Sequence, residues 1–173
     1  MYYIIMFFDY FELKIINNLQ TFNIDNTCRL FSKPFNTNYF IILSILLYLL
    51  KIFNFNDLII LYLGTLIILI IKIIVKRKRP YNYSSYVLNK SKKTHGKKLV
   101  KGDYFSFPSG HSFCATVFTL IMMQKFSKAY ILIFIPILVG FSRIYLGVHY
   151  ISDVVFGIIF GSIYFNIIKK YIY

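Results

Sequence analysis

Acidic residues are scarce in this sequence, which has only six Asp and Glu against twenty Lys and Arg. The acids are scattered singly, with no paired carboxylates: Asp9, Glu12, Asp25, Asp57, Asp103 and Asp153. Hard cations such as Mg²⁺ usually bind several carboxylate or phosphate oxygens. The shortage therefore disfavours a metal-dependent phosphatase site, and we expect neither a metal nor another cofactor.

Cysteine is also scarce. The two cysteines, Cys28 and Cys114, have no metal-ligand spacing and do not indicate a redox compartment. Cys114 lies in an apolar segment, where a buried free thiol is expected. The N-terminal apolar patch at residues 2–8 has no basic residue before it and no small-residue cleavage site after it. We therefore expect no removable signal peptide.

Apolar residues dominate instead, at 58% hydrophobic and 20% aromatic, with a mean hydropathy of +0.63. A soluble domain is closer to half apolar, so lipid is the expected surrounding. The length predicts one compact domain. Ten of the twenty basic residues lie between Lys76 and Lys101, a segment that we expect at an anionic membrane surface. Nucleic-acid binding is disfavoured because most of the remaining chain belongs in a bilayer.

Apolar runs of nearly membrane-spanning length predict an all-α, multi-pass membrane helix bundle with about five spanning helices. The runs are residues 39–53, 58–75, 108–124, 129–141 and 150–168. A turn is expected at 54–57, between the first two. Pro136 predicts a kink in the fourth helix. Gly157 and Gly161 predict a close approach of another helix to the fifth.

The N-terminal residues 1–38 mix apolar and polar side chains, which predicts a helix lying in the membrane interface. The alternative is a sixth span, which would have to absorb Asp9, Glu12 and Lys14. The expected division is an N-terminal interfacial segment at 1–38 and a membrane domain at 39–173.

The membrane domain is expected to contain a long basic loop at residues 76–107, and loops of this length are usually functional or disordered. Counting crossings places this loop and the turn at 142–149 on the same side of the membrane. The positive-inside rule does not fix the orientation, because some of the loop's charges would bind phosphate. The orientation, the membrane and the oligomeric state stay open.

The first of three chemical clusters is Lys72 with Arg79 and Pro80. Lys72 lies seven residues before Arg79, near the end of the second predicted span, and Pro80 is expected to stop any continuation of that helix. Two cations at a membrane boundary can hold a phosphate. On its own, however, the run 76–79 is more typical of a topogenic or anionic-lipid patch.

The second cluster is Pro108-Ser109-Gly110-His111. Proline and serine begin a helix, glycine lets the backbone approach a ligand, and the free amides of a helix start face an anion. Ser109 adds a hydroxyl donor, and His111 lies in the first turn. A helix cap with an incidental histidine is the alternative for this motif taken alone.

The third cluster is Ser142-Arg143 followed by His149 and Asp153. The histidine and the aspartate lie four residues apart, so the carboxylate can hold one ring nitrogen and leave the other free to attack. Arg143 supplies a further phosphate clamp. Taken alone, this cluster also fits a His–Asp pair that stabilises a helix end.

Together the three clusters resemble the type 2 phosphatidic acid phosphatase superfamily of membrane lipid phosphatases. The family pattern is Lys-x₆-Arg-Pro, then Pro-Ser-Gly-His, then Ser-Arg-x₅-His-x₃-Asp, and this sequence carries all three without substitution. The resemblance covers about residues 39–170 and implies catalysis without a metal. The family commonly shows six spans, whereas five are expected here.

The resemblance also implies a role for each motif residue. His149 would be the nucleophile that forms a phosphohistidine, and Asp153 would orient it. His111 would protonate the leaving hydroxyl and then activate water. The residues that would bind phosphate and stabilise the transition state are Lys72, Arg79, Ser109, Gly110 and Arg143. His95 fits no motif and is expected on the surface of the basic loop.

The expected function is hydrolysis of a lipid phosphate or diphosphate. Phosphatidic acid, phosphatidylglycerol phosphate and polyprenyl diphosphate are all compatible substrates. A non-catalytic lipid-phosphate-binding or scaffold protein is the alternative, but it needs no nucleophile, and the intact His111, His149 and Asp153 argue against it. A small anion transporter would need broken or charged helices at mid-membrane depth, and Pro136 is the only such sign.

Overall fold

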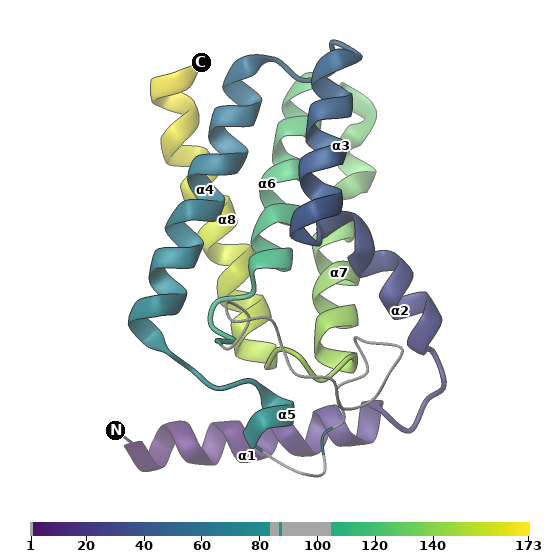
Figure 1. Cartoon of the computed structure of the whole chain (residues 1–173), viewed down its shortest axis with the longest axis vertical. Helices are drawn as coiled ribbons and strands as arrows, with labels where there is room; N and C mark the ends of the chain where they lie inside the picture. Colours follow the sequence, from purple (N-terminus) through teal and green to yellow (C-terminus); the bar gives the residue numbers. More distant parts are fainter. Residues whose placement is uncertain (1, 84–86, 88–104) are drawn as a thin grey trace.

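The computed structural model describes residues 2–83, 87 and 105–173, and these residues form helices joined by short connections (Figure 1). The predicted all-α fold is confirmed. The elements are α1 (Tyr2–Leu19), α2 (Asp25–Ser32), η1 (Lys33–Phe35), α3 (Thr37–Leu49), α4 (Phe55–Val75), α5 (Pro80–Tyr83), α6 (Gly110–Lys125), η2 (Ser127–Ile133), α7 (Phe134–Tyr145) and α8 (Ile151–Ile172). Here η marks a 3₁₀ helix. Each of the predicted apolar runs coincides with helical structure.

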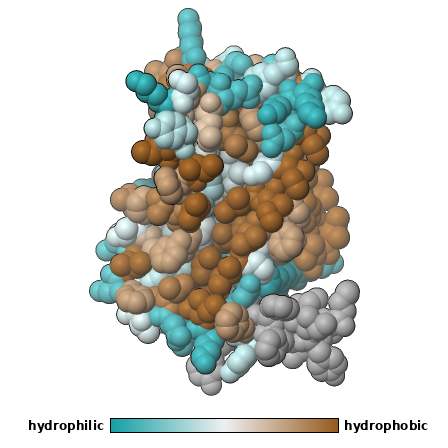
Figure 2. Space-filling model, turned by 180° about the vertical axis from the view of Figure 1, so that it is seen from behind, coloured by the Kyte–Doolittle hydropathy of each residue, from teal (hydrophilic) through white to brown (hydrophobic). Residues whose placement is uncertain are grey.

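The long helices α3, α4, α6, α7 and α8 run along one axis, and α1 lies across one end of this bundle (Figure 1). Within the described residues, three helical stretches are long and apolar enough to cross a membrane: α4, Ser127–Tyr145 and α8. The helix α3 is apolar but shorter. Apolar side chains cover the middle of the molecule, and polar ones gather toward its two ends (Figure 2). This distribution indicates an integral membrane protein, while the exact number of spans stays a prediction.

Both ends of α4 are fixed by local signals. Asn54 and Asp57 form a capping box, so the turn expected at 54–57 is the N-cap and first turn of α4. The helix ends at Val75, and Lys76 follows in the left-handed conformation with φ 54°. The expectation that Pro80 stops this helix is therefore wrong. Pro80 instead begins α5, where its missing N–H costs no hydrogen bond.

Pro136 also lies at a helix start. It is the third residue of α7, directly after the 3₁₀ stretch η2. A proline in the first turn removes no intrahelical hydrogen bond. The change from 3₁₀ to α geometry occurs at Phe134, two residues before Pro136, and the kink itself stays a prediction.

Helices α6 and α8 pack closely through the two glycines. A Cβ added at Gly157 would lie 2.6 Å from the backbone oxygen of Ser109, and one added at Gly161 would lie 3.0 Å from Cβ of Thr116. The prediction of close helix approach at these glycines is confirmed. Because Ser109 precedes α6, Gly157 also sets where the first turn of α6 lies.

Polar contacts fasten the opposite end of the bundle. The Asp57 carboxylate forms a 2.8 Å ion pair with Nζ of Lys125, and the Tyr173 hydroxyl donates to the same carboxylate. Asn56 donates to the backbone oxygen of Ile172 at 2.9 Å. These contacts join α4, α6 and the end of α8 far from the site described below.

We predict that Gly157→Ala destabilises the protein, because the new Cβ would collide with a backbone atom that cannot rotate away. Such overpacking costs about 1–3 kcal/mol, which exceeds the roughly 1 kcal/mol that alanine adds in helix propensity. Gly110→Ala is the matched control, since its Cβ would meet no atom closer than 3.8 Å. The apparent Tm in detergent should fall for Gly157→Ala and stay near wild type for Gly110→Ala. Equal Tm values for the two variants would contradict this packing.

Candidate active site

The three motifs meet at the end of the bundle where α4 ends and α6 and α8 begin (Figure 1). Nζ of Lys72 donates to the backbone oxygens of Phe105 and Ser106, both at 3.2 Å. Nη1 of Arg79 donates to the backbone oxygen of Val148 at 3.0 Å. The basic segment after α4 and the turn before α8 therefore lie on the same side, as the crossing count predicts.

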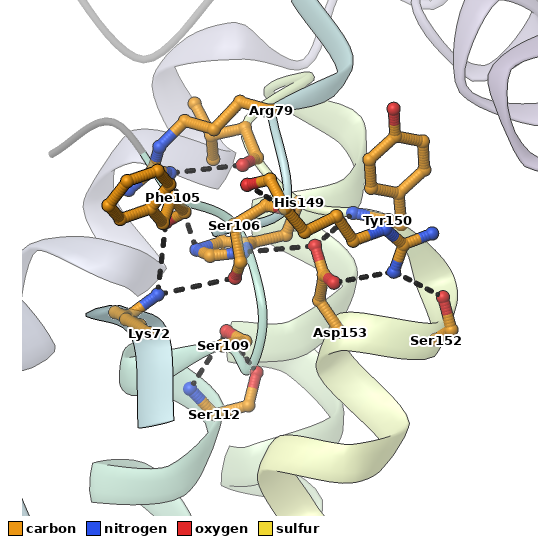
Figure 3. A network of polar contacts seen from close by, with 12 residues as sticks. Lys72, Arg79, Phe105, Ser106, Ser109, Ser112, His149, Tyr150, Ser152 and Asp153 are labelled. Atoms are coloured by element: carbon orange, nitrogen blue, oxygen red, sulfur yellow. Dashed lines mark hydrogen bonds and ion pairs between the residues drawn. The ribbon is translucent and has the colours of Figure 1, made fainter. Parts of the chain in front are cut away.

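His149 lies in the turn between α7 and α8 and is 2% exposed. Its Nε2 is 3.5 Å from Nη1 of Arg79, and its Nδ1 is 3.5 Å from Oδ2 of Asp153 (Figure 3). Burial places the pKa of His149 well below its usual value, and the charges of Arg79, Lys72 and Arg143 lower it further. The ring is therefore neutral at pH 7 and has a lone pair available.

Asp153 stands behind this ring in the first turn of α8 and is fully buried. Its Oδ2 accepts the backbone N–H of Tyr150 at 2.9 Å, and its Oδ1 accepts from Nη1 of Arg77 at 2.7 Å. These contacts fix both oxygens of the carboxylate and leave Oδ2 facing His149.

Arg77 is the polar residue that sequence reasoning missed. Its Nη1 also donates to Oγ of Ser152 at 2.8 Å, while its Nη2 donates to Asp9 and lies 3.4 Å from Oε2 of Glu12. Burial lowers the pKa of Arg77, but the charges of Asp153 and Asp9 raise it, so the net pKa is above its usual value. Arg77 therefore stays charged throughout the range in which the protein works.

The acids are not scattered singly as expected from the sequence. Asp9 and Glu12 lie three residues apart on one face of α1, and with Asp153 they converge on Arg77. The spacing of Asp9 and Glu12 was the available signal. It could not identify the partner, because Arg77 is one of four consecutive basic residues.

A cavity of about 510 Å³ opens beside His149. Its polar end is formed by Lys72, Arg79, His111 and His149, together with Gly110. The rest of its wall is mainly apolar and comes chiefly from η1, α3 and α4: Phe35, Thr37, Phe40, Ile41, Tyr62, Thr65, Leu66, Ile68, Leu69 and, from α6, Cys114. None of the described residues lining it is acidic. The cavity thus combines a cationic end with an apolar channel, which suits an anion attached to a hydrocarbon tail.

The remaining predicted site residues occupy different positions. His111 lines the cavity within electrostatic range of His149 and the three cations. Arg143 acts on both histidines through its charge but is not among the residues lining the cavity. Asp153 contacts His149 from behind. His95 lies outside the described residues.

Ser109 is fully buried as the N-cap of α6 and does not line the cavity. Its Oγ accepts from the backbone N–H of Ser112 at 3.3 Å and from the Ser112 hydroxyl at 2.9 Å. Gly110 is the next residue, and a Cβ there would lie 3.9 Å from Cε of Lys72. Glycine at this position keeps the space beside Lys72 open.

Known proteins resemble this chain in sequence. Over 85 residues it is 39% identical to phosphatidylglycerophosphatase B of Bacillus subtilis (strain 168), and the match covers 42% of this chain. The chain thus spans 42% of that relative's length, less than half.

Two solved structures share the fold, each with a TM-score of 0.71. One is a transmembrane PAP2-type phosphatidylglycerolphosphate phosphatase from Bacillus subtilis, at 22% identity, covering 92% of this chain and 83% of the other. The second is LpxE of Aquifex aeolicus, at 24% identity, covering 91% of this chain and 92% of the other.

The sequence pattern of a whole family also matches. The PAP2 superfamily pattern extends over residues 55–173, from the start of α4 to the last residue, and includes all three motifs. This match covers most of the chain, and the folds of the two solved structures agree with it. The chain therefore belongs to the PAP2 superfamily.

Proposed function

We propose that this protein hydrolyses a lipid phosphate or diphosphate without a metal, through a phosphohistidine formed on His149. The observation that carries the proposal is the buried, neutral ring of His149 at the cationic end of a cavity whose other walls are apolar. The printed name of the Bacillus relative, a phosphatidylglycerophosphatase, supports the same class of reaction.

In the first step, Nε2 of His149 attacks phosphorus and the bond from phosphorus to the lipid oxygen breaks. Nε2 is the attacking nitrogen because it faces Arg79, whereas Nδ1 faces Asp153. Asp153 holds the ring orientation and stabilises the positive charge that develops on it. His111, which also lines the cavity, gives its proton to the departing lipid oxygen.

In the second step, water attacks the phosphohistidine. His111 lost its proton in the first step, so it now accepts one from that water. The bond from phosphorus to Nε2 breaks, inorganic phosphate forms, and His149 returns to its neutral state. The product lipid carries a hydroxyl if the substrate was a monophosphate, and a monophosphate if it was a diphosphate.

The cations stabilise the charge on the five-coordinate phosphorus. Lys72 and Arg79 line the cavity, and Arg143 adds its charge from α7. We assign the backbone N–H groups at Gly110 and His111 to the phosphate as well, because free amides at a helix start favour an anion. Ser109 contributes by holding this helix start in place.

The apolar length of the cavity receives the substrate's tail between α3 and α4. Phosphatidic acid, phosphatidylglycerol phosphate and polyprenyl diphosphate all combine a phosphate with such a tail. The placement of α1 across the end that carries the site fits an interfacial segment at residues 1–38, with the membrane domain at 39–173 (Figure 1).

We predict that His149→Ala lowers phosphate release by at least about a thousand-fold, since losing a nucleophile removes the whole covalent route. Purified protein in excess EDTA is incubated with phosphatidic acid and, separately, with a polyprenyl diphosphate. Lys169→Ala, at the opposite end of the bundle, is the control and should keep wild-type activity. Equal activity of His149→Ala and wild type, or complete loss of wild-type activity in EDTA, would contradict the proposal. Binding without turnover by the wild type would instead indicate a lipid-phosphate-binding protein.

We also predict a bell-shaped dependence of kcat/KM on pH, because His149 must start neutral and His111 protonated. The pKa of His149 is lowered from 6.5, so the neutral ring persists at mildly acidic pH and the acid limb lies below 6.5. The neutral ring also stabilises the fold: this contribution is complete above pH 6.5 and is lost as the pH falls through the lowered pKa.

The pH profile is measured with two substrates whose phosphates differ in pKa. A limb caused by the enzyme stays at the same pH with both substrates, whereas a limb caused by the substrate moves. A flat profile, or an acid limb of the enzyme above pH 6.5, would be inconsistent with the assigned roles.

A further inference from the structure

The N-terminal helix α1 carries two buried acids at the end of the bundle that holds the site. Asp9 and Glu12 are each only 8% exposed, although α1 is not part of the bundle itself (Figure 1). Leu13 and Ile16 of the same helix are buried in a core cluster with Tyr150 and Val154 of the α8 start. The helix is therefore packed against the segment that carries His149 and Asp153.

Arg77 joins these acids to the site. One side of its guanidinium, Nη1, binds Asp153 and Ser152 at the start of α8, and the other side, Nη2, binds Asp9 and Glu12 of α1. Because a guanidinium is planar and its N–H groups point in fixed directions, Arg77 fixes the orientation of the Asp153 carboxylate as well as compensating its charge. The same guanidinium lies 3.9 Å from the centre of the Tyr150 ring, which restricts its position from a further direction.

Glu12 also holds the first turn of α8 without help from Arg77. Its Oε1 accepts the backbone N–H of Ser152 at 2.9 Å, and its Oε2 accepts the Ser152 hydroxyl at 3.0 Å. Ser152 directly precedes Asp153. The position of the carboxylate that faces His149 is thus determined from α1 by two routes, one through the guanidinium and one through the α8 backbone.

We infer that Arg77, held by Asp9 and Glu12 of α1, is a positioning residue that fixes Asp153 against His149. The N-terminal helix is therefore required for full catalytic activity. This inference rests on the proposed function, in which His149 is the nucleophile. Arg77 does not line the cavity and takes no part in the bonds that form or break.

The charge of Arg77 also shapes the titration of His149. Five charged or titratable groups face that ring: Lys72 of α4, Arg79 after α4, His111 of α6, Arg143 of α7 and Asp153 of α8. The ion pair with Arg77 partly neutralises the negative charge of Asp153. Without Arg77, the full charge of Asp153 would act on the ring, favour the imidazolium and move the acid limb of kcat/KM to higher pH.

The test compares Arg77→Gln, Arg77→Lys and Lys78→Gln. Lys78 is the matched control, because it is exposed in the same basic run and its substitution removes the same charge. We expect Arg77→Gln to lower kcat by about 10–100-fold, the usual effect of removing a partner that orients a functional ligand, and to move the acid limb upward. Arg77→Lys should restore the acid limb and part of kcat. Lys78→Gln should match wild type in both.

The role of α1 is tested by Asp9→Asn with Glu12→Gln, which keeps Arg77 and removes its α1 partners. We expect kcat to fall with no upward shift of the acid limb, because this variant removes negative rather than positive charge near the site. If Arg77→Gln does not fold, this double variant still tests whether the contacts of α1 with Arg77 are needed for catalysis. Wild-type kcat in this double variant would overturn the inference, as would a wild-type kcat and acid limb in Arg77→Gln.

His149→Ala separates the two possible failures. If it is inactive while Arg77→Gln behaves as wild type, only the inference about Arg77 is wrong. If His149→Ala retains activity, the proposed function fails and the inference fails with it.

Discussion

The structure depends on a neutral imidazole held out of water among cations. Among the described residues no carboxylate lines the cavity, and Lys72 and Arg79 donate to the backbone oxygens of Phe105, Ser106 and Val148. Backbone carbonyls orient a cation without cancelling its charge. Burial and the positive charges of Arg79, Lys72 and Arg143 keep His149 unprotonated, and the same charges suit a phosphate. One arrangement of charges thus prepares both the anion site and the nucleophile.

Helix packing and a peripheral ion network hold this arrangement in place. The close approach of α8 to α6 at Gly157 brings the start of α6 against the helix that carries Asp153. No carboxylate of the described residues lines the cavity, whereas Asp9, Glu12 and Asp153 meet Arg77 behind it. Separating the two sets of charges lets the acids orient the site without neutralising the cations that would bind substrate.

The sequence predicted the helices, because apolar runs of this length fit few other structures. It also predicted that the motifs would meet, and the helix start at Ser109 followed from its residue types. Sequence reasoning did not identify the role of Arg77, because that role depends on partners that are distant in the sequence. Nothing local distinguishes Arg77 from its basic neighbours, since its partners are 65 or more residues away. Pro80 was expected to stop a helix, but it begins one, because proline suits both a helix end and a helix start and only the neighbouring backbone decides between them.

In the proposed mechanism one phosphorus atom lies against Nε2 of His149, with its oxygens facing Lys72 and Arg79 and with the charge of Arg143 acting from α7. Vanadate, which mimics five-coordinate phosphorus, tests this most directly in a structure of the vanadate-bound protein. We expect vanadium bonded to Nε2 of His149, with its oxygens facing Lys72, Arg79 and His111. Vanadium bound elsewhere, or a His149 ring turned away from the bound anion, would contradict it.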